Sequence, residues 1–146
     1  MRETETFYLE ERRAIFALCF VYGLRMLGLF FVMPVIVYDL QTSNSMDLGL
    51  KAGFVIGAYG ITQAIFQIPF GILSDFFGRK KVIVIGLIIF SIGSLMASLS
   101  TNITELVIAR LVQGMGAISS VVTAFLADLT RPNVRTKAMA FVGLSI

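Results

Sequence analysis

A few charged and amide side chains interrupt otherwise apolar runs of this chain, and they are its candidates for chemistry. Arg25 and Arg110 lie inside such runs, and Gln113 follows Arg110 at the spacing of one helical turn. In an apolar setting each of these groups needs a polar partner or a watery surface. The chain has no His and a single Cys, which argues against imidazole relays, His-metal sites and an internal disulfide. We therefore expect no metal site and no cofactor.

Patterns typical of catalysis are missing from the sequence. It contains no Gly-rich phosphate loop, no Ser/His/Asp arrangement and no pair of catalytic carboxylates. We expect neither an enzyme nor an ATP-driven pump. Membrane topology explains the positions of the cations better than nucleic-acid binding does, so no nucleic-acid partner is expected.

The apolar runs have the length of membrane-spanning helices. Of the 146 residues 57% are hydrophobic, and the mean hydropathy of +0.88 is too high for a soluble domain. A bilayer core of about 30 Å needs about 20 helical residues. We predict an all-α membrane protein with helices at about 14–38, 52–73, 82–101 and 103–127, and a fifth helix at 138–146 that is cut short.

The cations lie mostly on one side of these predicted spans. Nine Lys and Arg residues precede the first span or follow the second and fourth, whereas the two opposite loops hold only Lys51. By the positive-inside rule, the side with nine cations is the cytoplasm. We therefore predict a cytoplasmic N-terminus.

Arg25 lies near the middle of the first span. A central Arg costs at least about 2.5–3.5 kcal/mol on insertion scales, so it must face protein or water. Tyr22, one turn earlier, is expected to share that environment. Two interpretations stay open: a structural Arg bonded to carbonyls of a broken neighbouring helix, or a substrate or proton-coupling site. Pro34 should bend the outer end of this helix.

The second span carries small residues and amides along one face. Glycines on one face let another helix approach closely, which explains them by packing. Gln63 and Gln67 either bond a neighbouring helix or face a wet cavity, and we assign them to a substrate cavity together with Tyr22 and Arg25. The residues that fall within about 40° of one direction are Gly53, Gly57, Gly60, Ala64, Gln67 and Gly71.

The fourth span has a charge toward each end and small residues between them. Arg110 lies in its outer half and Asp128 at its cytoplasmic end, 18 residues later. A helix of that length separates them by about 27 Å, so each needs another partner. Pro132 then blocks helix continuation and the chain turns in the cytoplasm.

Two segments of the chain resemble signatures of the major facilitator superfamily. Between the second and third spans, Gly71-Ile-Leu-Ser-Asp-Phe-Phe-Gly-Arg-Lys-Lys81 resembles Gly-x-Leu-Ser/Ala-Asp-x-Phe/Tyr-Gly-Arg followed by two basic residues. It departs at Phe76, where the family usually has Arg or Lys. Arg110-Leu-Val-Gln-Gly-Met-Gly-Ala117 resembles the second signature, Arg-x-x-Gln-Gly-x-Gly. The similarity runs from about Glu11 to Ile146 and is greatest to the drug:proton antiporter branch.

This resemblance implies a fold and a function. The fold is the major facilitator fold, with two six-helix bundles around a central cavity, and residues 1–146 are expected to be part of the N-terminal bundle: helices one to four and the start of helix five. The implied function is secondary active transport in the cell inner membrane, by proton-coupled efflux of a small molecule. The implied partners are the lipid bilayer, the substrate, protons and a missing C-terminal half of the same polypeptide.

The resemblance also assigns roles to residues. A conformational latch would be broken when the cytoplasmic side opens, and its Asp75 would face the start of a helix in the missing half. Phe76 would soften this latch. Arg110, Gln113 and Gly114 would serve proton coupling. The latch would consist of Gly71, Asp75, Gly78, Arg79, Lys80 and Asp128.

Two alternatives remain. The chain is a small four-helix membrane protein that acts as an oligomer, or it is an inactive truncated product. Small multidrug exporters have this size but depend on an acid in the first span, where this chain has Arg25. Coding sequence that continues past Ile146 would favour the transporter.

Overall fold

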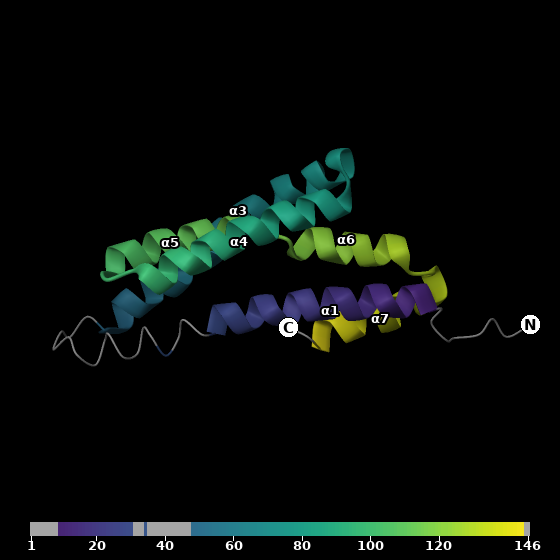
Figure 1. Ribbon diagram of the computed structural model, residues 1–146, viewed down its shortest axis with the longest axis horizontal. Helices are drawn as coiled ribbons and strands as arrows, with labels where there is room; N and C mark the ends of the chain where they lie inside the picture. Colours follow the sequence, from purple (N-terminus) through teal and green to yellow (C-terminus); the bar gives the residue numbers. More distant parts are fainter. Residues whose placement is uncertain (1–8, 31–33, 35–47, 145–146) are drawn as a thin grey trace, which may run out of the picture.

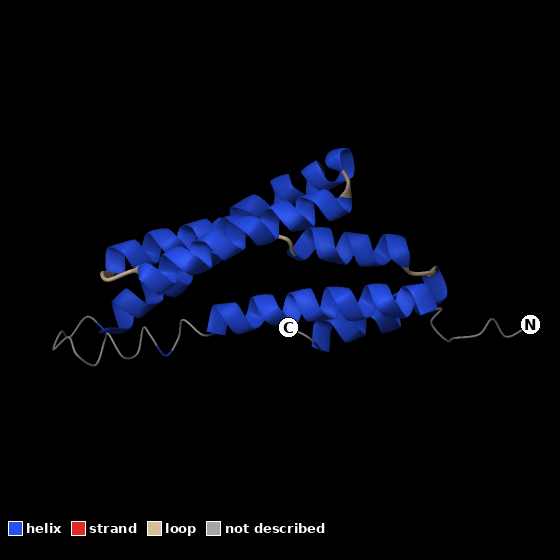
Figure 2. Ribbon diagram, viewed as in Figure 1, coloured by secondary structure: helices blue, strands red, loops and turns tan. Residues whose placement is uncertain are grey.

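Six helices make up almost all of the described part of this protein. The computed structural model describes residues 9–30, 34 and 48–144. No strand occurs in these ranges, as Figure 2 shows, so the predicted all-α class is confirmed there. The helices are α1 (Leu9–Phe30), α3 (Leu48–Phe77), α4 (Arg79–Leu99), α5 (Ile103–Met115), α6 (Ser119–Leu129) and α7 (Pro132–Leu144) (Figure 1).

Within the described ranges, four stretches are long and apolar enough to cross a membrane: α1, α3, α4, and α5 together with α6. Their bounds differ from the predicted ones. α3 continues to Phe77 and therefore contains Asp75, which the sequence places in a loop, and α4 begins at Arg79. The predicted bend at Pro34 and the predicted end of the first helix at 38 involve residues outside the described ranges.

The fourth span is broken, whereas the sequence predicts one continuous helix over 103–127. Gly116–Ile118 separate α5 from α6. Glycine weakens a helix by about 1 kcal/mol relative to alanine, and here it also permits contact with α4. A Cβ atom on Gly116 would lie 2.5 Å from the carbonyl oxygen of Gly86. The break therefore depends on tertiary packing as well as on local sequence.

The last described helix also begins earlier than expected. Pro132 is the first residue of α7, where its missing N–H would be unpaired in any helix. It therefore interrupts the preceding helix, as predicted, and starts the next one. The helix predicted at 138–146 is observed over Pro132–Leu144.

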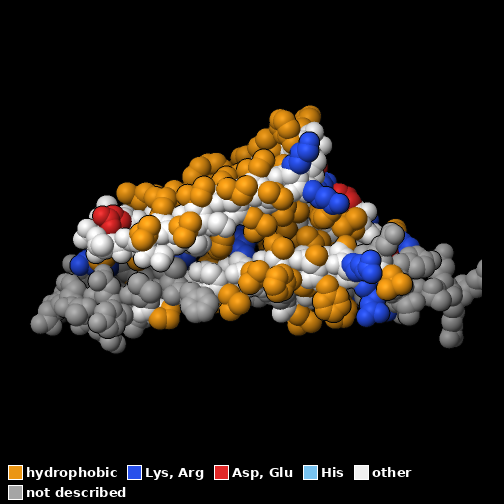
Figure 3. Space-filling view, in the orientation of Figure 1, with side chains coloured by type: hydrophobic (Ala, Val, Ile, Leu, Met, Phe, Trp, Pro, Cys, Tyr) orange, Lys and Arg blue, Asp and Glu red, His pale blue; other side chains and the backbone are white. Residues whose placement is uncertain are grey.

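The apolar core has two parts. The larger part joins α1, α6 and α7 to the facing ends of α3 and α4. The smaller joins α3, α4 and α5 through Val55, Ala97, Leu106 and Ala109. In Figure 1, α3, α4 and α5 lie on one side and α1 with α7 on the other, and α6 lies between them. Large apolar side chains cover much of the outer surface (Figure 3), as expected of helices that face lipid.

An ion pair ties the start of α1 to the connection between α6 and α7. Arg131 Nε lies 3.2 Å from Glu11 Oε1, and the same oxygen accepts a hydrogen bond from the backbone N–H of Arg131 at 3.3 Å. Glu11 is buried. The start of α1 and the connection between α6 and α7 lie at the same end of the bundle as the turn from α3 to α4, on the right in Figure 1.

The glycines at which helices pack closely are not those predicted on one face of the second span. A Cβ on Gly114 would lie 2.5 Å from the carbonyl oxygen of Tyr59, so α5 packs directly against the backbone of α3. By contrast, nothing among the described residues lies within 4 Å of a Cβ on Gly53, Gly57 or Gly60. The packing expected of these three glycines is therefore absent from the described part of the chain.

Candidate functional site

Arg79, the first residue of α4, connects three helices at one end of the bundle. Its Nη2 lies 2.8 Å from Asp75 Oδ1 on α3, and its Nε lies 2.8 Å from Asp128 Oδ2 on α6. Its Nη1 donates to Ser74 Oγ at 2.8 Å. All three nitrogens of the guanidinium therefore have a partner: Ser74 and Asp75 lie within five residues of Arg79 in the sequence, whereas Asp128 lies 49 residues away. The two carboxylates remain more than half exposed, so water competes for these ion pairs.

The other predicted latch residues surround this cluster in different ways. Gly71 contributes its carbonyl oxygen, which accepts a hydrogen bond from Ser74 at 2.6 Å. Gly78 has φ of 92°, a conformation that favours glycine and allows the sharp turn from α3 to α4. Lys80 is exposed and makes no ion pair with the described residues, so it is not brought into the cluster. Phe76 is also exposed.

Arg110 and Gln113 form a second, buried cluster on α5. Arg110 Nη1 donates to Gln113 Oε1 at 2.7 Å, and its Nη2 donates to the carbonyl oxygen of Leu29 at 3.2 Å. Gln113 Nε2 donates to Ser94 Oγ at 2.8 Å, and Ser94 donates to the Phe90 carbonyl oxygen at 2.9 Å. The chain of donors therefore ends on backbone carbonyls of α1 and α4.

Burial explains why this cluster needs such partners. Arg110 is 2% exposed and Gln113 is fully buried, and buried polar groups are costly unless they are hydrogen-bonded. The prediction that Arg110 and Asp128 have separate partners is confirmed, since Asp128 pairs with Arg79. Gly114 belongs to the cluster by position, but its observed contact is the close packing of α5 on α3.

Arg25 forms a third cluster, where α1 meets α3 and the start of α6. Its Nη1 donates to Ser119 Oγ at 3.0 Å and its Nη2 to the Tyr59 hydroxyl at 2.9 Å. Gln63 Nε2 also donates to Ser119 Oγ, at 3.3 Å. Arg25 Cζ lies 6.0 Å from the centroid of the Tyr22 ring, so these two residues share an environment. The structural alternative, an Arg bonded to a broken neighbouring helix, is met in part: Ser119 is the first residue after the break between α5 and α6, but among the described residues the acceptors are hydroxyls and not carbonyls.

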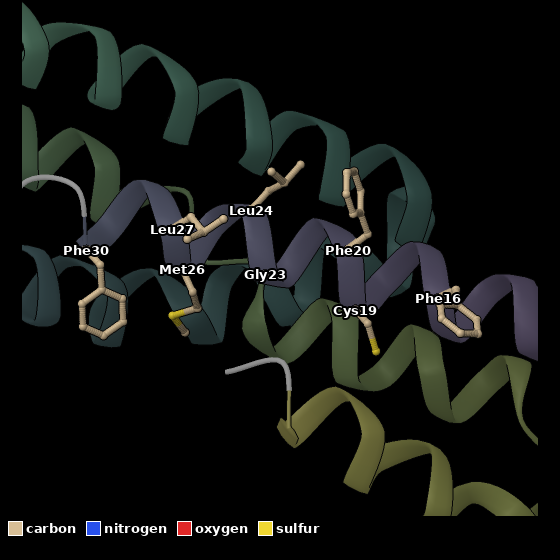
Figure 4. A pocket seen from close by; sticks show the side chains of 8 residues that line it. All are labelled: Phe16, Cys19, Phe20, Gly23, Leu24, Met26, Leu27 and Phe30. Atoms are coloured by element: carbon tan, nitrogen blue, oxygen red, sulfur yellow. The ribbon is translucent and has the colours of Figure 1, made fainter.

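The residues assigned to a substrate cavity are not all on an open surface. Tyr22 and Arg25 are buried, whereas Gln63 and Gln67 are partly exposed. Gln67 accepts a hydrogen bond from Ser120 at 3.0 Å through its backbone oxygen. The groove in Figure 4 lies elsewhere, along the outer side of α1. It has a volume of about 540 Å³ and is lined by Phe16, Cys19, Phe20, Gly23, Leu24, Met26, Leu27 and Phe30.

Four hydroxyl residues of these clusters escaped the sequence-based prediction. Ser74 could have been predicted from the sequence, because it lies inside the first signature, next to Asp75. Tyr59 precedes Gln63 by one helical turn, which places both on one face of α3. Nothing in the sequence around Ser94 or Ser119 predicts a role for them. Their partners, Gln113 and Arg25, lie 19 and 94 residues away in the chain.

Known proteins resemble this chain over most of its length. It is 51% identical over 136 residues to the inner membrane transport protein YajR of Escherichia coli (strain K12). It is 46% identical over 136 residues to an uncharacterized transporter of Buchnera aphidicola subsp. Schizaphis graminum, and 33% identical over 140 residues to the quinolone resistance protein NorA of Staphylococcus aureus (strain N315). In each case 92% of this chain is covered.

The chain spans about a third of the length of these relatives, 30% of YajR and 34% of the other two. The sequence pattern of the Major Facilitator Superfamily matches residues 15–146. Both predicted signatures lie in that range, one at the turn between α3 and α4 and the other at the end of α5 and in the break that follows it. This chain belongs to the Major Facilitator Superfamily.

Proposed function

We propose that this chain acts within a secondary active transporter that exports a small molecule across the cell inner membrane in exchange for protons. Its helices would form part of an N-terminal bundle, completed by a C-terminal half of the same polypeptide, with the N-terminus in the cytoplasm. Efflux is supported by relatives named for multidrug and quinolone resistance, and the inner membrane by the likeness to YajR.

The observation that carries this proposal is the Arg79 cluster. Alternating access requires contacts that hold one conformation and then release it. Exposed ion pairs suit that task, because each contributes only about 0–1 kcal/mol and can break without unfolding the helices. Arg79 makes two such pairs, to Asp75 on α3 and Asp128 on α6. We assign the role of conformational latch to these three residues, with Ser74 as an additional partner and Gly71 and Gly78 shaping the turn.

Proton coupling is assigned to the Arg110 cluster. An arginine keeps its charge at physiological pH, so Arg110 would act by lowering the pKa of an acid elsewhere in the protein or by responding to that acid's charge. The buried hydrogen bond to Gln113 holds its guanidinium in one position. Displacement of that guanidinium when the bundle moves would change the acid's proton affinity.

The transport activity can be tested in everted membrane vesicles from cells that produce the complete polypeptide. We expect a proton gradient to drive accumulation of a fluorescent quinolone such as norfloxacin, which carries a carboxylate, and a protonophore to abolish it. Accumulation no higher than in vesicles without the protein would contradict the proposed efflux.

The latch is tested by Asp75→Asn in the same vesicles. This change removes the charge that pairs with Arg79 and keeps the size of the side chain. We expect it to abolish accumulation and to leave the equilibrium affinity for the transported probe within a few-fold. Lys81→Gln serves as the matched control, since Lys81 is an exposed neighbouring cation without an ion pair among the described residues. A large loss of affinity in Asp75→Asn with conformational exchange intact would contradict the latch.

A further inference from the structure

Arg25 is a deeply buried charge whose partners are all neutral. The side chain is 2% exposed, and it donates to the hydroxyls of Tyr59 and Ser119. Two aromatic rings lie beside it, with Cζ 5.6 Å from the Phe90 centroid and 6.0 Å from the Tyr22 centroid. Its Nε has no hydrogen-bond partner among the described residues. Aromatic faces ease the burial of a cation, but they do not neutralise it.

Donors outnumber acceptors around Arg25. The guanidinium and the Gln63 amide group supply N–H donors, and the Ser119 hydroxyl accepts from both. The hydroxyl hydrogens of Ser119 and Tyr59 are then directed away from Arg25, and no acceptor for either is found in the described part of the chain. An acceptor is therefore missing from this cluster.

The Arg110 cluster shows the contrast. Arg110 is equally buried, but its donors meet the carbonyl oxygen of the Gln113 side chain and a backbone carbonyl of α1, and the network ends on a backbone carbonyl of α4. The Nε of Arg110, like that of Arg25, has no partner among the described residues. The two sites differ in their acceptors: those of Arg110 are carbonyl oxygens, whereas those of Arg25 are hydroxyls, each of which brings a further donor to the site.

No carboxylate of the described residues lies within ion-pair distance of Arg25. An arginine cannot lose its charge on burial as a lysine can, and a buried charge without a counter-ion is strongly unfavourable. The start of α6 adds to the positive potential, because Ser119 is the first residue of that helix and the N-terminus of a helix attracts anions. The site therefore favours an oxyanion.

The site is also open on one side. Tyr59, Gln63 and Ser119 are each partly exposed, although Arg25 itself is buried behind them. Figure 3 shows Lys or Arg atoms within the depression between the α4–α5 layer and α1, where the surface is otherwise apolar or uncharged. An anion that approaches Tyr59 and Ser119 from this side would meet polarised hydroxyl groups with the guanidinium directly behind them.

We infer that Arg25, Tyr59, Gln63 and Ser119 form a binding site for the carboxylate, or a similar oxyanion, of a small-molecule substrate. This inference rests on the proposed transport function and names the class of its substrate: organic anions with an apolar body. The anionic group would accept hydrogen bonds from the Tyr59 and Ser119 hydroxyls and from the Gln63 amide. The competing source of an oxyanion is an Asp or Glu side chain elsewhere in the same polypeptide.

A first experiment separates these two sources without any ligand. It compares the melting temperatures of the complete purified protein and its Arg25→Gln variant in detergent, in a chloride buffer free of oxyanions. We expect the melting temperature of the variant to be equal or higher, because the change removes a buried charge that has no permanent counter-ion. A fall that Arg25→Lys does not show would assign the oxyanion to the protein itself and overturn the inference.

A second experiment tests binding with 1-naphthoate and its neutral isostere 1-naphthamide, at constant ionic strength. We expect naphthoate to raise the melting temperature of the wild type saturably by a few degrees and naphthamide not to raise it. Ser119→Ala should weaken or abolish the rise, and Ser120→Ala should preserve it. Ser120 is the matched control, since its hydroxyl donates to the backbone carbonyl oxygen of Gln67, whereas the Ser119 hydroxyl accepts from Arg25.

Two outcomes of this second experiment would overturn the inference. One is an equal response of the wild type to naphthoate and naphthamide, whether both raise the melting temperature or neither does. The other is a naphthoate response that is the same in Ser119→Ala as in Ser120→Ala. Because these measurements need no proton gradient, the anion site can fail while the vesicle assay succeeds, and the reverse also holds.

Discussion

At the scale of single residues, the two buried arginines differ in how tightly their partners fix them. Arg110 bonds to a side-chain amide on its own helix and to a carbonyl of α1, so it links two elements through strong acceptors. A hydrogen bond to a charged group contributes about 1.5–3 kcal/mol, and removing one partner of a buried bond costs more than the bond itself. Substitutions at Arg110 should therefore affect both stability and coupling, and the two effects must be measured separately.

We predict that Arg110→Ala uncouples transport from the proton gradient, whereas Arg110→Lys keeps part of the coupling. Alanine removes the donor that Arg110 supplies to Gln113 Oε1 and to the Leu29 carbonyl. Lysine keeps the charge and can reach one of the two acceptors, but it lacks the planar fork that reaches both. The measurement is gradient-driven accumulation in sealed vesicles, compared with exchange of the same probe without a gradient.

The control for this prediction is Ser94→Ala. It removes the acceptor for Gln113 Nε2 and leaves the bond between Arg110 and Gln113 in place, so its effect on coupling should be smaller. Normal gradient-driven accumulation by Arg110→Ala, with unchanged exchange, would reduce Arg110 to a packing residue.

At the scale of helices, the sequence predicts elements that depend on local composition and misses those that depend on contacts. The apolar runs identify all four spans because each is long enough by itself. The break between α5 and α6 is not predicted, since Gly116 is an ordinary helix position until its packing against Gly86 is known. For the same reason Arg25 is predicted to need a partner, but Tyr59 and Ser119 are not named as that partner.

Packing at this scale predicts opposite effects for two glycines, Gly114 on α5 and Gly60 on α3. A Cβ on Gly114 would overlap the α3 backbone, so Gly114→Ala should lower the free energy of unfolding by about 1–3 kcal/mol. Gly60 has nothing within 4 Å in the described part of the chain, so Gly60→Ala should raise it by up to about 1 kcal/mol through helix propensity. The measurement is an unfolding titration of the complete protein in mixed micelles.

The Gly60 variant also reports on what covers α3. A lower free energy of unfolding for Gly60→Ala would contradict the prediction above and would mean that a helix outside the described residues packs on the face that bears Gly53, Gly57 and Gly60. Equal effects of Gly114→Ala and Gly60→Ala would mean that both faces of α3 are packed with similar closeness, which is the arrangement expected of a helix between two bundles.

At the scale of the whole molecule, the three polar clusters share one span. The fourth span carries Arg110 on α5, Ser119 at the start of α6 and Asp128 near its end, and the break at Gly116–Ile118 separates the first from the other two. A change of angle at this break would move the latch and the anion site together, relative to Arg110. The proposed coupling, binding and latch residues are thus connected through the backbone of one span.

The orientation of this arrangement in the membrane is the last prediction. The turn from α3 to α4 and the start of α7 lie at one end of the bundle, and the connection between α4 and α5 lies at the other (Figure 1). The first end carries Arg79, Lys80 and Lys81 and is therefore expected in the cytoplasm. Reporter fusions after Ser45 and Lys81 should be active in the periplasm and the cytoplasm, respectively. The reverse pattern would place the Arg79 cluster outside the cell and contradict its assignment as a cytoplasmic latch.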